Sequence, residues 1–227
     1  VTADVDVGDT RTITGTVPSW LTLTDKGDGT ATLTGTPTND HVGNHAISLT
    51  VKDAANAQGT QAFALTVTNT NDAPTITSTP VTAATEDAVF TASITTTDVD
   101  AGDTRVITAT KPAWLQITDN GNGTATLTGT PTNDHVGNNA VTITVTDAGG
   151  ATATQSFVIV VANTNDPPAF TSTPATSTAE DALFTYSIVT ADVDVGDTRT
   201  ITGTVPSWLT LTDKGDGTAT LTGTPTN

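Results

Sequence analysis

Hydrophobic and polar residues alternate with a period of two along most of the chain. The stretch NAVTITVTD, residues 139–147, places Val141, Ile143 and Val145 on one side and threonines on the other, as a half-buried antiparallel strand requires. The same alternation recurs throughout the chain, interrupted by Gly, Asn, Asp and Pro, and no segment has the period of a helix. The pattern therefore predicts an all-β protein.

The pattern returns every 94 residues. Residues 1–39 are identical to residues 189–227, and 28 of these 39 positions are also identical in residues 95–133. This period is longer than that of solenoid repeats and suits an autonomous sandwich domain of about 100 residues. With the phrase NTND as the seam, we expect the C-terminal part of one module (1–72), a complete module (73–166) and the N-terminal part of a third (167–227), cut from a longer array.

Within the complete module the alternation predicts seven short strands separated by turn residues. Seven strands with turns at this spacing favour a Greek-key β-sandwich. The predicted strands are 75–78, 88–95, 105–110, 114–118, 124–128, 139–146 and 153–161.

Composition limits the partners. The chain has 24 acidic residues against 7 Lys and Arg, a net charge of −17, which argues against nucleic acid or an anionic membrane surface and favours cations. No apolar run is long enough to span a bilayer, so we expect no direct membrane insertion. Cysteine is absent, which excludes disulfides and thiolate metal sites.

The segment DKGDGTATL, which begins at Asp25, offers the alternating acids of a calcium loop. The middle copy reads DNGNGTATL from Asp119, so an acid is lost at Asn122 while every glycine is kept. Glycine preceded by Asn or Asp tolerates a positive φ in tight turns. We therefore interpret the segment as a hairpin turn in preference to a calcium loop.

The aromatic and histidine residues offer two further candidates. Trp114 in PAWL is either an exposed platform for sugars or a buried anchor at the sandwich margin, and the scarcity of aromatics favours burial. The histidines are His41, His45 and His135, and His45 becomes Asn139 in the next copy. No Ser or Cys nucleophile motif accompanies them, so we expect structural or surface histidines and no enzyme activity.

The acidic residues recur at fixed places in the repeat. One interpretation is solvated loop acids that keep a threonine-rich surface soluble. The other is spatial: in a sandwich with an odd number of strands the termini lie at opposite poles, so a linker acid can meet loop acids of the next module. The recurring acids are DVD in all three copies, Glu86 and Glu180, Asp72 and Asp166, and Asp53 and Asp147.

The order of these motifs resembles a known superfamily. The sequence has ED, then DxDxGD, an acid after a GTP turn, TDAGG and finally NTNDxP. Along the whole chain this resembles the bacterial cadherin-like and "putative immunoglobulin" repeats of large calcium-dependent surface adhesins, and PAWLQITDNGNGTATLTGTPTN is most similar to the second. The resemblance implies calcium ions at the seams between consecutive modules.

Carried over position by position, the resemblance implies two ligand sets and part of a third. The linker is one residue shorter than the family pattern, with Asn69 in its leading place, and Asp134 is followed by His135 where the family has a second acid, so we expect one or two ions per seam. The first set is Asp40, Asn71, Asp72, Asp98, Asp100 and Asp147; the second is Glu86, Asp134, Asn165, Asp166, Asp192 and Asp194; and Asp4, Asp6 and Asp53 are expected to face a seam upstream of residue 1.

These expectations combine into a function. We expect calcium-binding, calcium-rigidified extender repeats of a bacterial cell-surface or secreted adhesin, an extracellular protein of cell adhesion. Their partners would be neighbouring repeats of the same chain, with any cell-surface or matrix ligand bound through other domains. The alternative is a carbohydrate-binding accessory module of a secreted polysaccharide-degrading protein, which exposure of Trp114 would favour and its burial would weigh against, and homophilic adhesion between arrays stays open.

Overall fold

The computed structural model describes residues 10–227. Their contacts divide the chain into two compact units, one of residues up to Thr75 with Thr96–Val106 and Val145–Ala153, the other of Ile76–Thr95, Ile107–Thr144 and Thr154–Asn227. Residues 1–72, 73–166 and 167–227 are called the first, middle and third repeat below. Within the part of the chain that is described, no helix is long and apolar enough to cross a membrane.

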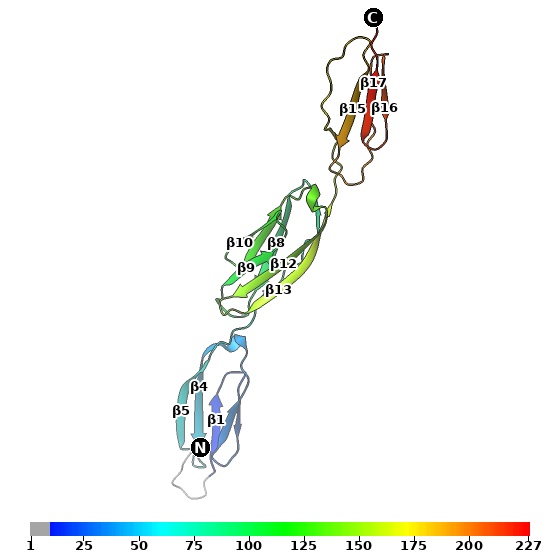
Figure 1. The fold of residues 1–227 in the computed structure, drawn as a ribbon. Coiled ribbons are helices and arrows are strands. Elements are labelled where there is room, and N and C mark those ends of the chain that lie inside the picture. The colour runs from blue at the N-terminus through cyan, green and yellow to red at the C-terminus, as the bar shows by residue number, and fades with distance from the viewer. Residues whose placement is uncertain (1–9) are drawn as a thin grey trace. The chain divides into compact units, whose positions relative to one another are not determined.

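The middle repeat is built of two four-stranded sheets (Figure 1). One sheet has the order β10-β11-β8-β6 and the other β7-β13-β12-β9. The all-β prediction is confirmed. The strands are β6 (Thr75–Ile76), β7 (Ala83–Thr85), β8 (Phe90–Thr97), β9 (Arg105–Thr110), β10 (Leu115–Asp119), β11 (Thr124–Gly129), β12 (Gly137–Asp147) and β13 (Thr152–Ala162).

The prediction of seven strands misses one of the eight strands of the middle repeat, β7. The first predicted strand, 75–78, overlaps β6, and the chain then forms β7 in the other sheet, where β7 runs parallel to β13 with Val160 beside Ala83. The strand β7 has only three residues, Ala83, Ala84 and Thr85, and alanine has little intrinsic preference for strands. The strand forms because its backbone pairs with β13, and the local sequence pattern does not predict it.

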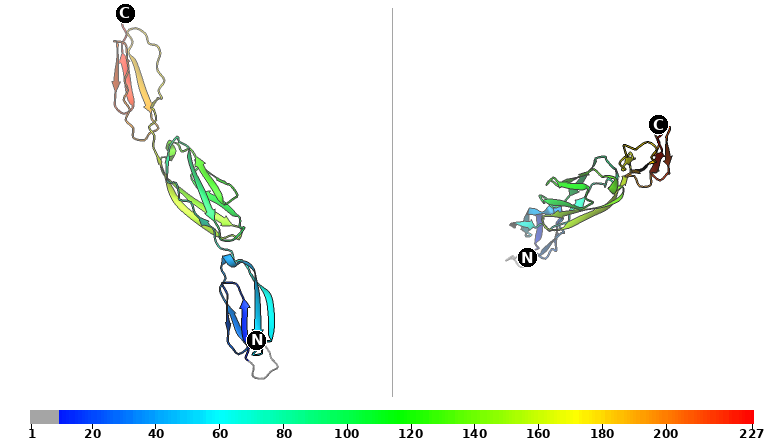
Figure 2. Two further views of the ribbon diagram at one scale, coloured as in Figure 1. Left: turned by 180° about the vertical axis from the view of Figure 1, so that it is seen from behind. Right: turned by 45° about the horizontal axis from the view of Figure 1, so that its top comes forward.

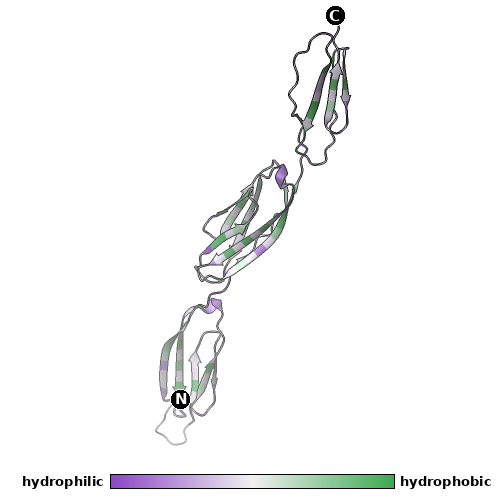
Figure 3. Ribbon diagram, in the orientation of Figure 1, coloured by the Kyte–Doolittle hydropathy of each residue, from purple (hydrophilic) through white to green (hydrophobic). Residues whose placement is uncertain are grey.

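The core of the middle repeat follows from the period of two. Leu115, Leu127, Ile143 and Ile159 are fully buried, and burial alternates strictly with exposure along β8 from Phe90. Figure 3 shows the same alternation of hydrophobic and polar positions along the strands. Burial of such side chains contributes about 1.5–3 kcal/mol each and is the main favourable term for the sandwich.

The first and third repeats form sheets of the same kind (Figure 2). The first repeat has a three-stranded sheet, β1-β4-β5, and the β2-β3 hairpin, and the third has a four-stranded sheet, β14-β15-β17-β16. Two 3-10 helices, η1 (Asn39–His41) and η2 (Asn133–His135), precede β4 and β12. The remaining strands are β1 (Thr12–Thr16), β2 (Thr22–Asp25), β3 (Ala31–Thr34), β4 (Gly43–Lys52), β5 (Gln58–Val67), β14 (Ala169–Phe170), β15 (Phe184–Ala191), β16 (Leu209–Asp213) and β17 (Thr218–Gly223).

The segment with alternating acids is a hairpin turn, as predicted. In the middle repeat it joins β10 to β11, and Gly121 and Gly123 have φ of 72° and 78°, a region that side chains other than glycine rarely adopt. Asp119 supports the turn with both oxygens: Oδ1 accepts from the Gly121 amide at 3.0 Å and Oδ2 from the Ile107 amide at 2.9 Å. The acid therefore satisfies backbone groups of the fold.

Candidate metal centre

A cluster of carboxylates lies in the first unit, in the loop DVDAGD that follows β8. One oxygen from each of Asp98, Asp100 and Asp103 lies within 4.8 Å of the others. The loop is folded by its own acids, because the Asp100 amide donates to Asp98 Oδ1 at 3.0 Å and the Thr104 amide donates to Asp103 Oδ1 at 2.7 Å. Three carboxylates are thus held close together by short-range backbone bonds.

The linker of the first repeat is bonded to this loop and to the end of β12. The Asp72 amide donates to Asp100 Oδ2 at 2.7 Å, and Asn71 Nδ2 donates to Asp147 Oδ2 at 2.9 Å. From the other side, Asn39 Nδ2 in η1 donates to Asp72 Oδ2 at 2.8 Å. Four separate segments of sequence therefore meet here: η1, the linker, the loop after β8 and the end of β12.

Asp147 is held in its charged form. Burial, the largest influence, raises the pKa of Asp147, but hydrogen bonds from Asn71 and from the amides of Ala151, Gly150 and Gly149 together bring this pKa below its ordinary value. Gly149 is necessary for the contact with Asn71, since a Cβ atom at that position would lie 2.1 Å from Asn71 Oδ1. The carboxylate is therefore ionised at neutral pH and fixed in place.

Several buried carboxylate oxygens of the two clusters accept no hydrogen bond from the described residues. They are Asp98 Oδ2, Asp100 Oδ1 and Glu86 Oε2, and the side chains of Asp100 and Glu86 are only 6% and 2% exposed. A buried charged group without a partner is costly. The oxygens are of the hard kind that calcium and magnesium prefer, so the residues present fit a bound divalent cation.

The second unit repeats three of these linker and loop contacts, and in addition Asn163 Nδ2 donates to Asp194 Oδ1 at 2.9 Å. The Asp166 amide donates to Asp194 Oδ2 at 2.6 Å, Asn133 Nδ2 donates to Asp166 Oδ2 at 2.7 Å, and the Asp194 amide donates to Asp192 Oδ1 at 3.0 Å. Asn165 Nδ2 donates to the Asp166 carbonyl at 3.1 Å, as Asn71 does to the Asp72 carbonyl at 3.3 Å. These contacts bring together four of the six residues of the second predicted set, which are Asn165, Asp166, Asp192 and Asp194.

The second unit also holds Glu86 within its cluster. Oxygens of Glu86, Asp166 and Asp194 lie within 4.8 Å of one another, and Asp194 forms a further such group with Asp192 and Asp197. The Thr164 amide donates to Glu86 Oε1. Carboxylates from three segments of the chain therefore lie close together at this place.

Two predicted ligands lie at the margin of these clusters. Asp40 in η1 and Asp134 in η2 are exposed, and Asp134 lines a shallow hollow together with Asp87 and Asp166. Asp53 accepts from the Ala57 amide at 2.8 Å. The other two acids assigned to an upstream seam, Asp4 and Asp6, lie outside the described residues.

The sequence reasoning missed some participants. Asp103 and Asp197 belong to the clusters, and Asn39 and Asn133 provide the amide contacts to the linker aspartates. The acids had a signal, since the last Asp of DxDxGD recurs in all three copies. The asparagines precede Asp40 and Asp134 directly, and only the 3-10 helix decides which of the two neighbours faces the linker.

The tryptophan of the middle repeat is buried, as predicted. Trp114 is 9% exposed, packs edge-on against Phe90 with ring centroids 5.9 Å apart, and donates from Nε1 to Asn139 Oδ1 at 2.9 Å. The ring centroid of His135 lies 6.2 Å from that of Trp114. His135 also caps η2, where its Nδ1 accepts a hydrogen bond from the Thr132 amide at 3.0 Å. These residues have structural roles.

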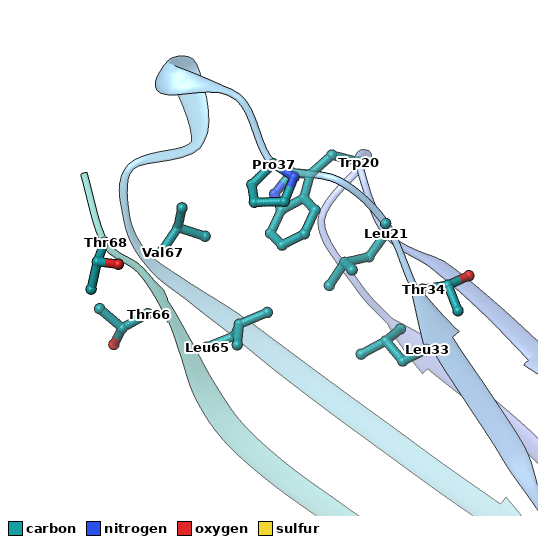
Figure 4. Close-up of a pocket in the computed structure, with 10 residues that line it drawn as sticks. Trp20, Leu21, Leu33, Thr34, Pro37, Leu65, Thr66, Val67 and Thr68 are labelled. Atoms are coloured by element: carbon teal, nitrogen blue, oxygen red, sulfur yellow. The ribbon is translucent and has the colours of Figure 1, made fainter. Parts of the chain in front are cut away.

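The first repeat has an open hollow beside its own tryptophan, Trp20 (Figure 4). Its lining combines threonines with apolar side chains, and the apolar ones include Leu21, Leu33, Leu65 and Val67. The residues 94 positions later are core residues, of which Leu115, Leu127 and Ile159 are fully buried and Val161 is 2% exposed. The apolar part of the hollow is therefore formed by residues that belong to the core of the repeat.

Comparison with known proteins gives the family. A family model described as "Putative Ig domain" matches residues 1–68 and 73–162. The chain belongs to this family. Among curated proteins no sequence gives a significant match to this Putative Ig domain chain.

Solved structures show the same fold as this member of the Putative Ig domain family. The structure "Protocadherin Gamma B2 extracellular cadherin domains 1-5" aligns with a TM-score of 0.62 at 15% identity, over 94% of this chain and 46% of that one. The structure "Protocadherin gammaB7 EC3-6 cis-dimer structure" gives 0.60 at 19% identity, over 93% and 57%. The fold is therefore cadherin-like, and the chain spans less than two thirds of these relatives.

A third similarity is to a glycoside hydrolase. "Endo-fucoidan hydrolase MfFcnA4 from glycoside hydrolase family 107" aligns at 26% identity over 96% of this chain and 34% of that one, with a TM-score of 0.41. A TM-score of this size does not establish a common fold for the aligned regions.

Proposed function

We propose that the chain is a set of calcium-binding, calcium-rigidified extender repeats of a bacterial cell-surface or secreted adhesin, without enzyme activity of its own. One observation carries the proposal. Asp100 is 6% exposed, and one of its oxygens is buried and accepts no hydrogen bond from the described residues, while the other accepts from the linker amide of Asp72. The same carboxylate thus holds the linker and has an oxygen left for a cation.

The residues that would hold calcium are those of the two clusters. In the first unit they are Asp98, Asp100 and Asp103 with Asp147 nearby through Asn71. Calcium takes roughly six to eight oxygen ligands from carboxylates, amide carbonyls and backbone carbonyls. The ion would supply the positive charge that offsets converging carboxylates, which otherwise repel one another.

The mechanical consequence follows from where these residues come from in sequence. Linker residues Asn71 and Asp72 already share hydrogen bonds with the loop after β8 and the end of β12. An ion bound to the same carboxylates adds a strong electrostatic link to these bonds and restricts the linker. Calcium sites of extracellular modules have Kd values of about 10⁻⁴–10⁻³ M, so we place the protein outside cells, where calcium is abundant.

The partners are neighbouring repeats of the same chain, and any cell-surface or matrix ligand is bound through other domains. The competing function, a carbohydrate-binding accessory module, depends on an exposed aromatic platform. Trp114 is buried against Phe90 and its N–H is used within the repeat. Its burial therefore weighs against the carbohydrate-binding alternative.

The test is thermal unfolding and small-angle X-ray scattering of the chain in calcium and in chelator. We expect calcium to raise Tm and to narrow the distribution of dimensions, with about 2.7 kcal/mol of added stability at a hundredfold excess over Kd. The double substitution of Asp98 and Asp100 by Ala should remove the effect at the first cluster. A chain that melts at the same temperature and scatters identically in both buffers would refute the proposal.

The control removes an acid elsewhere. Asp28→Ala deletes one negative charge from the β2-β3 hairpin, where Asp28 bonds only to Thr30 in the described structure. Its calcium response should match that of the unmodified chain. If Asp28→Ala weakens the calcium response as much as substitution of Asp98 and Asp100 does, the response depends on the net charge of the chain and the proposed site is wrong.

A further inference from the structure

The two linkers of the chain differ in the residue that follows their aspartate. The first linker reads NTNDAP over residues 69–74 and the second reads NTNDPP over residues 163–168, so Asp72 precedes an alanine and Asp166 precedes Pro167. The Asp166–Pro167 bond lies between β13 and β14, outside both strands, and Pro167 is exposed. The second linker therefore presents an aspartyl-prolyl bond at the surface, and the first linker does not.

Proline makes its own nitrogen a better leaving group. Its ring nitrogen carries no proton, so the peptide bond to Pro167 is a tertiary amide. The nitrogen of a tertiary amide is more basic than that of an ordinary peptide bond, and it takes up a proton from water more readily as the bond breaks. In the first linker Ala73 forms an ordinary peptide bond with the aspartate.

The aspartate before the proline carries the nucleophile. Attack of the Asp166 carboxylate on its own backbone carbonyl carbon closes a cyclic anhydride, and an intramolecular attack of this kind is strongly favoured over a bimolecular one. Asn133 Nδ2 in η2 donates to Oδ2 of this carboxylate at 2.7 Å, and the side chain is half-buried. Asn133 thus holds one oxygen of the nucleophile in place.

The carbonyl group of the same bond is polarised by a neighbouring side chain. Asn165 Nδ2 donates to the Asp166 carbonyl oxygen at 3.1 Å. A donor at this oxygen withdraws charge from the carbonyl carbon and stabilises the negative oxygen that forms when a nucleophile adds. The second linker therefore has a nucleophile, an oxyanion donor and a good leaving group at one peptide bond.

We propose that the chain cleaves itself at the Asp166–Pro167 bond. Oδ1 of Asp166 forms a bond to its backbone carbonyl carbon; the bond from that carbon to the Pro167 nitrogen then breaks, and the nitrogen takes up a proton from water. Water opens the resulting anhydride, so that Asp166 becomes a new C-terminus with two carboxylates and Pro167 a new N-terminus. The net change is one water consumed, with no oxidant or reductant.

The first linker is an internal control for this reaction. Asn71 Nδ2 donates to the Asp72 carbonyl at 3.3 Å, and Asn39 Nδ2 donates to Asp72 Oδ2 at 2.8 Å. The nucleophile and the polarised carbonyl are therefore arranged alike in the two linkers. The leaving group differs, since Ala73 follows Asp72, so the proline should decide which linker is cleaved.

The experiment is incubation of the chain in mildly acidic buffer, because the leaving nitrogen needs a proton, followed by mass spectrometry of the intact products. Chelator in the buffer makes the outcome independent of the proposed calcium sites. We expect two fragments, residues 1–166 and 167–227, and no cleavage after Asp72. A folded chain that stays intact while the urea-unfolded chain is cleaved in the same buffer would overturn the proposal, as would equal cleavage of the two linkers.

Reciprocal substitutions test the leaving group. Pro167→Ala gives the second linker the NTNDAP order of the first and should slow cleavage after Asp166 at least tenfold. Ala73→Pro gives the first linker the NTNDPP order of the second and should introduce cleavage after Asp72. Both positions are exposed, and circular dichroism confirms that each variant is folded. Cleavage of the Pro167→Ala chain at the rate of the unmodified chain would contradict the mechanism.

A third variant tests the contribution of the folded linker. Asn165→Ala removes the donor to the Asp166 carbonyl and should slow cleavage of the folded chain several-fold. In urea the contact is lost in both chains, so the variant and the unmodified chain should be cleaved at the same rate. A folded Asn165→Ala chain that is cleaved as fast as the unmodified chain would show that the proposed oxyanion donor is wrong.

Discussion

The hydrogen bond between Trp114 and Asn139 leads to a prediction about the stability of the middle repeat. The first repeat provides a natural comparison, because it has His45 where the middle repeat has Asn139. In the middle repeat the buried indole donates to Asn139 Oδ1, and Asn139 Nδ2 donates to the carbonyls of His135 at 2.7 Å and Gly137 at 3.1 Å. In the first repeat Trp20 Nε1 is buried, and no acceptor for it is found among the described residues. We therefore expect Asn139→Ala and Asn139→His to destabilise the middle repeat by different amounts.

The magnitude follows from the bonds removed. Leaving a buried donor without an acceptor costs about 1–3 kcal/mol, so Asn139→Ala should cost about 2 kcal/mol, or about 10 °C in Tm for a domain of this size. Histidine should recover about half of this loss. In the first repeat His45 Nε2 still contacts the His41 carbonyl at 2.6 Å, and its ring lies edge-on to Trp20 with centroids 5.5 Å apart, a contact worth about 0.5–1.5 kcal/mol.

The assay uses the three tryptophans as reporters. Each repeat has one, Trp20, Trp114 and Trp208, so three indole N–H signals in NMR spectra follow urea unfolding of the repeats separately. Asn139→Ala should lower the midpoint for the Trp114 signal and leave the Trp20 signal unchanged. An Asn139→Ala midpoint equal to that of the unmodified chain, or a histidine variant less stable than the alanine variant, would refute the reasoning.

Two further predictions concern single acids. Asp119→Ala should cost about 1–3 kcal/mol in urea unfolding because the buried Ile107 amide loses its acceptor, whereas Asn120→Ala next to it should cost little; equal costs would contradict the assignment. The pKa of Asp147 is lowered by folding, so its stabilising contribution is complete above the ordinary carboxyl pKa of about 3.9, declines as pH falls below that value, and is lost once pH has fallen through the lower pKa of the folded chain. Asn71→Ala should therefore destabilise at pH 7 and lose this effect in acid, and a pH-independent difference between the two chains would count against the bond.

Much of the fold can be predicted from the sequence, because the alternation of hydrophobic and polar residues shows which side of each strand is buried. All seven predicted strands of the middle repeat coincide with observed strands to within two residues at each end, and Gly121 and Gly123 mark the hairpin. The strand β7 is different, because its three residues are too few to show an alternation and the residues of β13 that they pair with lie 77 positions later. Local pattern cannot encode a pairing of that kind.

The candidate site was partly predictable for the same reason. Repetition at a fixed period identified the acids of DVD and the linker, and the structure brings Asp72 to Asp100 and Asp166 to Asp194. Asn39, and not its neighbour Asp40, contacts the linker aspartate Asp72. The three-residue helix η1 sets the directions of these two side chains, and the sequence pattern does not predict those directions. A sequence can thus name the segments that meet while leaving open which residue of a segment makes the contact.

The matching bonds of the two linkers have a consequence for how such a protein changes length. Each joint takes Asn39 or Asn133 and the linker aspartate from one repeat, and the DVD loop from the next. Because donors and acceptors recur at the same places every 94 residues, loss or gain of a whole unit by in-frame recombination recreates every joint at the point of exchange. Lengths that are not multiples of the unit destroy a joint, so variation in copy number among such genes should proceed in whole steps.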